Sequence, residues 1–137
     1  MKIKTLSALL MLSMFCLLIS CKKSSPVTNS NPAYVGLWKG KYGGGTNYPT
    51  NGYAMLFRNN GTFRVFGGTD TLIATLKGEG TYTVSNGTTI NGSYTYPDDG
   101  GTYSISATLN SNNTFLEGTW GNAPSNSNGG MFFMVKQ

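Results

Sequence analysis

The chain has 137 residues, no histidine and two cysteines, with ten basic residues against five acidic ones. Four of the basic residues lie in the first 23 positions, so positions 34–137 carry six basic and five acidic residues, a net charge of +1. Because no basic patch remains in positions 34–137, we do not expect this region to bind nucleic acid.

The chain begins with a short apolar run that is typical of an export signal. Two lysines precede 14 apolar or small residues at positions 6–19, which is shorter than the roughly 20 residues that span a bilayer. The run ends in Leu-Ile-Ser-Cys at positions 18–21, which resembles the lipobox of bacterial lipoproteins. This resemblance implies a signal peptide at positions 1–20 and a lipid on the sulfur of Cys21. A plain secretory signal is the alternative.

Positions 21–33 are polar and rich in Ser, Asn and Pro, which favours a flexible tether behind the lipidated cysteine. Two or more acyl chains hold a protein stably on a membrane, so we expect a membrane-anchored protein. In Gram-negative lipoproteins, an aspartate after the cysteine tends to retain the protein in the inner membrane. The residue here is Lys22, so the resemblance implies the bacterial outer membrane, on its periplasmic face or on the cell surface.

Positions 34–137 are predicted to form one all-β domain, because Asn-Gly turns separate short runs rich in β-branched and aromatic residues. The expected fold is an antiparallel, eight-stranded up-and-down meander barrel, and a two-sheet sandwich is the alternative. The strands are expected near 35–42, 53–58, 62–67, 71–84, 88–96, 101–109, 114–121 and 130–136.

Alternation along a strand assigns residues to the inner and outer faces. Trp38 and Tyr42 are expected inside on the first strand. The fourth strand is expected to point Leu72, Ala74 and Leu76 inward, followed by four more inward positions that end at Val84. On the last strand the residues expected inside are Met131, Phe133 and Val135.

The turns predict which residues lie opposite each other. An Asn59-Asn60-Gly61 loop places Phe57 opposite Phe63. A loop at 85–87 pairs Tyr82 with Ile90, and a loop at 97–100 pairs Tyr94 with Tyr103. A loop at 110–113 pairs Tyr103 with Trp120.

A Gly-x-Tyr or Gly-x-Trp pattern occurs six times, at 36–38, 40–42, 80–82, 92–94, 101–103 and 118–120. Glycine suits a strand that coils sharply around a narrow barrel, and a neighbouring large ring covers the backbone that glycine leaves bare. An interior of eight strands is either filled by side chains or holds one small ligand.

The Gly-x-Trp at Gly36 and Trp38 is similar to the signature of the lipocalin family, and Trp120 near the end is similar to avidin-like barrels. The resemblance implies a lipocalin-like lipoprotein that binds a small ligand in the barrel or at its mouth. Lipocalins pack a late arginine on this tryptophan, whereas the last arginine here is Arg64. Lys136, the only late cation, is expected on the outer face.

Catalysis is not expected, because the domain lacks histidine and a free thiol and its strand charges are predicted to point outward. We predict no catalytic residue, no metal site and no cofactor. The predicted partner is a small apolar or aromatic ligand held by Trp38, Phe63, Tyr82, Tyr94, Tyr103 and Trp120. The alternative is a solidly packed barrel that binds or inhibits an envelope protein, which exposed Ile73 and Phe115 would favour.

Overall fold

The structure, a computed structural model, describes residues 31–137 and contains only strands, turns and loops there. In this part of the chain no helix is long and apolar enough to cross a membrane. The signal peptide, the lipidation of Cys21 and most of the tether lie outside the described residues. The eight strands are β1 Gly36–Tyr42, β2 Asn51–Phe57, β3 Thr62–Phe66, β4 Lys77–Ser85, β5 Thr89–Thr95, β6 Thr102–Leu109, β7 Phe115–Asn122 and β8 Gly130–Lys136.

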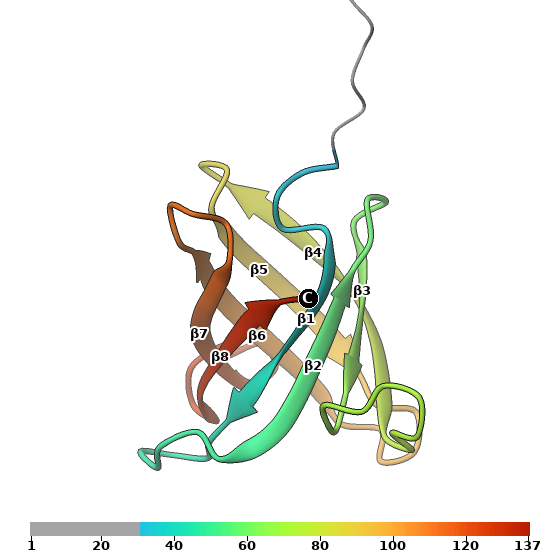
Figure 1. Ribbon diagram of the computed structural model, residues 1–137. Coiled ribbons are helices and arrows are strands. Elements are labelled where there is room, and N and C mark those ends of the chain that lie inside the picture. The colour runs from blue at the N-terminus through green and yellow to red at the C-terminus, as the bar shows by residue number, and fades with distance from the viewer. Residues whose placement is uncertain (1–30) are drawn as a thin grey trace, which may run out of the picture. The chain divides into compact units, whose positions relative to one another are not determined.

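Each strand pairs with its neighbours in sequence, and β8 pairs back onto β1 to close the barrel (Figure 1). All eight pairings are antiparallel. The predicted up-and-down barrel is therefore confirmed, and the sandwich alternative is wrong. Closure pairs the strands all the way around, so the sheet has no open edge.

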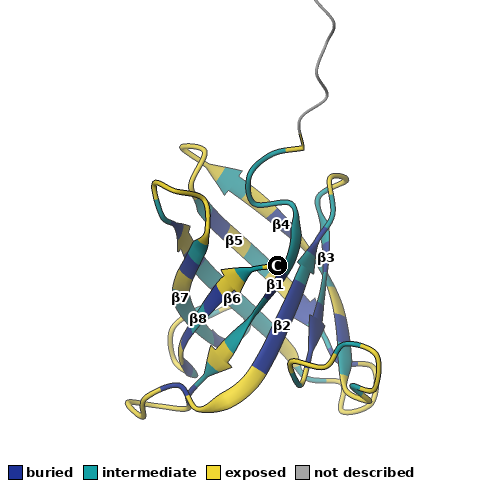
Figure 2. Ribbon diagram, in the orientation of Figure 1, coloured by how far each residue is buried: buried dark blue, intermediate teal, exposed yellow. Residues whose placement is uncertain are grey.

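The core is the barrel interior, where inward side chains from all eight strands meet. Buried and exposed positions alternate along the strands, while most hairpin loops are exposed (Figure 2). Trp38, Phe57 and Phe63 are at most 1% exposed, and Phe57 stacks on Phe63 at 5.3 Å between ring centroids. The middle of the barrel is therefore filled by side chains.

Two of the predicted registers are confirmed. Phe57 lies opposite Phe63, and the intervening loop has Gly61 at a φ of 78°, which glycine adopts without strain. Tyr94 lies opposite Tyr103 across the β5–β6 hairpin. In both hairpins the loop length expected from the turn residues gives the observed pairing.

Two other predicted registers are wrong by two residues. Tyr82 lies opposite Gly92 instead of Ile90, and Trp120 lies opposite Ile105 instead of Tyr103. In the first hairpin the loop runs over 86–88 and closes at Ser85 and Thr89. A shift of two residues leaves every side chain on its predicted face, so the inward positions of Tyr82 and Trp120 stand.

The predicted fourth strand is too long, because β4 begins only at Lys77. Asp70 organises a turn instead: its carboxylate accepts a hydrogen bond from the Leu72 N–H at 3.0 Å, and its carbonyl oxygen accepts one from the Ala74 N–H at 3.1 Å. Local bonds of this kind compete with a strand ladder. Leu72 is 89% exposed, and Leu76 also lies outside the strand, so the prediction that Leu72, Ala74 and Leu76 line the interior as strand residues is wrong.

The predicted faces of the last strand are also wrong. Phe132 and Met134 are buried, whereas Met131 and Val135 are exposed. Phe133 is half-buried and stacks on Phe115 at 6.1 Å on the outer face. Five consecutive apolar residues hide the alternation, and the pairing of β8 with β1 places Lys136 opposite the inward Trp38.

The Gly-x-aromatic repeat has a steric cause at three of its six positions. A β-carbon on Gly40, Gly80 or Gly118 would lie between 1.9 and 2.1 Å from a carbonyl oxygen of the neighbouring strand. Only glycine permits such a close approach of two backbones. The repeat therefore marks places where tightly coiled strands press together.

Candidate functional site

One end of the barrel is closed by the segment that precedes β1. The indole N–H of Trp38 donates a hydrogen bond to the carbonyl oxygen of Tyr34 at 2.8 Å, and the Tyr34 ring packs edge-on against Tyr82 at 5.8 Å. The Lys136 ammonium donates to the carbonyl oxygen of Ala33 and lies 5.6 Å from the centre of the Trp38 ring. Lys136 therefore covers Trp38, and its predicted outward position is wrong.

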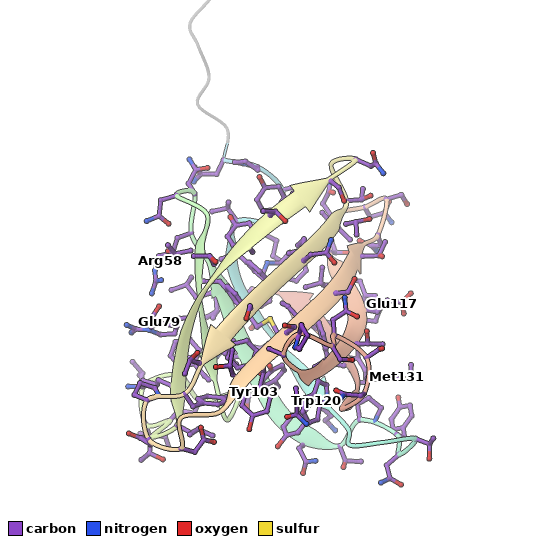
Figure 3. All side chains as sticks on the ribbon, turned by 180° about the vertical axis from the view of Figure 1, so that it is seen from behind. Arg58, Glu79, Tyr103, Glu117, Trp120 and Met131 are labelled. Atoms are coloured by element: carbon purple, nitrogen blue, oxygen red, sulfur yellow. The ribbon has the colours of Figure 1, made fainter. Side chains whose placement is uncertain are left out.

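The other end holds a cavity of about 160 Å³, between the ends of the strands and the loops 67–76 and 96–101. Six of the nine lining residues are aromatic. The lining residues are Tyr42, Tyr53, Gly67, Leu76, Tyr94, Tyr96, Asp99, Tyr103 and Trp120. We call this cavity the aromatic pocket; Tyr103 and Trp120 lie side by side in it (Figure 3).

The rings of the aromatic pocket meet at varied angles. Tyr94 and Tyr103 stack at 5.6 Å with 28° between their planes, and Tyr96 stands at 89° to Tyr94. Trp120 is 6.1 Å from Tyr103 at 60°, and Tyr42 stands at 84° to Trp120. These angles give the pocket walls on several sides instead of a single stacked column.

Two tyrosine hydroxyls form a polar contact inside the aromatic pocket. The hydroxyl groups of Tyr53 and Tyr94 share a hydrogen bond of 2.8 Å. Burial raises the pKa of Tyr94 to about 12, although the hydrogen bond with Tyr53 opposes the rise. Burial also raises the pKa of Tyr53 and of Tyr96 well above the usual range. At neutral pH all three side chains are therefore neutral hydroxyls that can donate or accept a hydrogen bond.

Trp120 is fixed in place by the loops on either side of it. Its indole N–H donates to the carbonyl oxygen of Gly43 at 2.9 Å, and Gly129 passes so close that a β-carbon there would lie 2.5 Å from the indole ring. The Gly129 N–H also donates to the carbonyl oxygen of Trp120 at 2.9 Å. This wall of the pocket is therefore formed before any ligand arrives.

The loops around the aromatic pocket contribute one acidic and one aliphatic side chain to its lining, Asp99 and Leu76. Asp99 is exposed, and one of its carboxylate oxygens accepts a hydrogen bond from the Gly101 N–H at 2.7 Å. Leu76 lines the pocket from the loop 67–76, on which Leu72 and Ile73 are 89% and 76% exposed. The predicted exposure of Ile73 is confirmed.

The structure brings together half of the predicted ligand-binding residues. Tyr94, Tyr103 and Trp120 line the aromatic pocket. Trp38 and Phe63 are fully buried in the packed middle of the barrel, and Tyr82 lies at the closed end, where its hydroxyl donates to the carbonyl oxygen of Arg58 at 2.6 Å. These six residues therefore do not form a single site.

Sequence reasoning missed Tyr42, Tyr53, Tyr96 and Asp99 as neighbours in one pocket. The available signal was the direction of each strand, because successive strands of a meander run in opposite directions. The ends of β1, β5 and β7 therefore lie at the same end of the barrel as the starts of β2 and β6. Inward aromatic residues at these positions must lie near one another.

The charged residues of the strands lie mostly outside. Arg58 contacts Glu79 at 3.0 Å, and Arg64 also pairs with Glu79, on the outer surface where Figure 3 labels Arg58 and Glu79. Partial burial of Glu79 opposes ionisation, but hydrogen bonds from both arginines prevail and lower the pKa of its carboxyl group. Within residues 31–137, no cluster of three or more His, Cys, Asp or Glu side chains is placed to hold a metal ion.

Comparison with known proteins gives no relative from which a function can be carried over. A scan against protein-family models finds no match, and a search of curated proteins finds none either. The geometry of the aromatic pocket is therefore the main guide to function.

Proposed function

We propose that this protein is a lipocalin-like lipoprotein that binds a small aromatic ligand in the aromatic pocket and catalyses no reaction. The observation that carries the proposal is the pocket of about 160 Å³ with its six aromatic walls. A dry cavity of about 150 Å³ takes up benzene, so the pocket volume suits a ligand with one ring. The Tyr53, Tyr94 and Tyr96 hydroxyls supply the few polar groups that orient a ligand in a mostly apolar site.

The non-catalytic part of the proposal follows from the chemistry of the lining. Proton transfer near neutral pH is most efficient with a group whose pKa lies near that pH. Burial raises the pKa of Tyr53, Tyr94 and Tyr96 instead. The only lining carboxylate, Asp99, is exposed at the rim. The lining therefore suits binding better than acid–base chemistry.

Single-ring compounds such as phenol and toluene should raise the melting temperature of residues 31–137 and change the fluorescence of Trp120. A ligand at 100 times its Kd stabilises the folded state by about 2.7 kcal/mol. Trp120→Phe should weaken binding and remove most of the fluorescence response, while Trp38, which is fully buried and does not line the aromatic pocket, still reports folding. Tyr48→Leu is the control, because Tyr48 is 76% exposed and does not line the aromatic pocket. The proposal is wrong if no compound gives saturable binding.

A role in binding another protein is the second candidate, and an apolar groove on the outer face favours it. Phe115, Phe133, Met131 and Tyr48 line this groove over β7 and β8, and Met131 is 57% exposed. Exposed apolar patches of this kind often mark protein contacts. A protein that acts only through this face should bind no compound of the single-ring panel, so the same titration separates the two candidates.

We also propose that Cys21 carries a lipid that anchors the protein in the bacterial outer membrane. The support is the lipobox-like Leu-Ile-Ser-Cys at positions 18–21 and the Lys22 that follows. Cells given a fatty-acid probe should label the wild type, and Cys21→Ala should stay unprocessed and unlabelled. The control is Cys16→Ala, which changes the other cysteine and should be labelled like the wild type. Equal labelling of Cys21→Ala would contradict the anchor.

A further inference from the structure

At the end of the barrel that holds the aromatic pocket, which we call the open end, the loops carry charge of one sign only. The four loops at this end, at 43–50, 67–76, 96–101 and 123–129, contain the acidic residues Asp70, Asp98 and Asp99 and no basic residue. A ligand that approaches the aromatic pocket therefore meets loops that carry only negative charge, which attract cations and repel anions.

The basic residues closest along the chain to the open end sit on the outer face. Lys41 and Lys77 occupy the ends of β1 and β4 next to these loops. Lys41 is next to the inward Tyr42, and Lys77 is next to the inward Gly78. Successive residues of a strand point to opposite faces, so both lysines point away from the interior. Neither lysine lines the pocket.

The lining of the aromatic pocket, like the loops around it, contains an acidic residue and no basic one. Asp99 carries the only carboxylate among the nine lining residues, which include no lysine or arginine. A tyrosine hydroxyl is neutral at physiological pH, and burial raises the pKa of Tyr53, Tyr94 and Tyr96 further from that range. The carboxylate of Asp99 is therefore the charge that decides which ligands the pocket prefers.

Aromatic walls add a second attraction for positive charge. The face of a tyrosine or tryptophan ring carries a negative quadrupole that attracts an ammonium group within about 6 Å. In the aromatic pocket, Tyr96 stands at 89° to Tyr94, and Trp120 stands at 60° to Tyr103. Rings at such different angles surround a compact cation better than a parallel stack does.

We propose that the ligand of the aromatic pocket is a small organic cation, an aryl or alkyl ammonium whose charge lies between the aromatic rings and the Asp99 carboxylate. This inference rests on the proposed function, because it names the ligand class for the same pocket. The ring or alkyl part of the ligand fills the cavity of about 160 Å³, and the ammonium lies at the rim.

The test compares two probes that have the same shape and differ in charge, phenyltrimethylammonium and tert-butylbenzene. Titration calorimetry with residues 31–137 should give about tenfold tighter binding for the cation at low salt, the range expected of cation–π contacts and one nearby carboxylate. The preference should shrink as salt is added, because the rim is exposed to solvent.

Asp99→Asn should weaken binding of phenyltrimethylammonium by about fivefold to tenfold and leave the affinity for tert-butylbenzene within about twofold. The asparagine side-chain oxygen can still accept the hydrogen bond from the Gly101 N–H, so the turn is kept. Asp98→Asn is the matched control, since Asp98 is the exposed neighbour in the same turn and does not line the aromatic pocket.

The outcomes separate this inference from the proposed function. Equal or tighter binding of tert-butylbenzene, or an Asp99→Asn variant that binds the cation like the wild type, would overturn the cation inference while the ligand pocket stands. Tighter binding of benzoate than of phenyltrimethylammonium would also overturn it. Saturable binding of none of the three probes, nor of any compound in the single-ring panel, would overturn the pocket itself.

Discussion

Gly80→Ala should lower the free energy of unfolding by about 3 kcal/mol, at the upper end of the range for overpacking. A β-carbon on Gly80 would lie 2.0 Å from the carbonyl oxygen of Ser93 and 2.7 Å from the α-carbon of Tyr94. Both atoms belong to the backbone of β5, so no rotamer change relieves the contact and the two strands must move apart. Urea denaturation followed by tryptophan fluorescence measures the loss.

Gly44→Ala is the control for this prediction. A β-carbon on Gly44 would meet no atom within 4 Å, so its unfolding free energy should stay within about 0.5 kcal/mol of the wild type. The steric account of the Gly-x-aromatic repeat is wrong if the two variants unfold at the same urea concentration.

Much of the fold was predictable because turn chemistry and alternation act locally. The loop at Asn59-Asn60-Gly61 and the inward Phe57 and Phe63 sit within a few residues of each other, and both the turn and the register are confirmed. The number and order of the strands followed from such local signals repeated along the chain.

Two of the errors arose where side chains bonded to the backbone of the turn itself. The side-chain oxygen of Asn110 accepts hydrogen bonds from the N–H groups of Thr114 and Phe115 at 2.9 and 3.0 Å. The loop therefore extends to Thr114, and Leu109 pairs with Leu116. Asp70 organises a turn in the same way, which replaces the first residues of the expected fourth strand, so that β4 begins only at Lys77. Composition favours a turn at both places but does not tell how many residues each turn takes.

The aromatic pocket was only half predictable, because it depends on contacts between residues far apart in sequence. The hydroxyl bond between Tyr53 and Tyr94 joins positions 41 residues apart, and the bond from Trp120 to Gly43 joins positions 77 apart. Alternation shows that Tyr94 and Trp120 point inward, but only the folded barrel shows which inward side chains leave space between them.

The barrel should lose stability steeply as the pH rises from about 10 to 12, because buried tyrosines resist ionisation. Burial raises the pKa of Tyr94 to about 12, whereas the same side chain in the unfolded chain has a pKa of about 10. Below pH 10 both states keep the proton, so the contribution of Tyr94 to stability is complete. Between these pKa values the unfolded state releases the proton and the folded state holds it, so folding becomes less favourable.

With pKa values of about 10 in the unfolded chain and about 12 in the folded protein, Tyr94 loses about 2 kcal/mol of its contribution to stability by pH 12. Burial raises the pKa of Tyr53 and Tyr96 in the same direction, so the total loss should exceed the share of Tyr94. Urea denaturation at intervals between pH 8 and 12 gives the free energy of unfolding at each pH, and tyrosinate absorbance reports ionisation alongside it.

Tyr94→Phe should flatten this pH dependence even though the variant starts from a lower stability at neutral pH. The phenylalanine has no proton to lose, while the loss of the hydroxyl leaves Tyr53 without its 2.8 Å partner and so lowers the baseline. Tyr48→Phe should keep the slope of the wild type, because Tyr48 is 76% exposed and lies outside the aromatic pocket. If Tyr94→Phe and Tyr48→Phe gave the same slope above pH 10, the alkaline loss would have to come from tyrosines outside the aromatic pocket, and the neutral, hydrogen-bonded hydroxyls proposed to orient a ligand would lose their support.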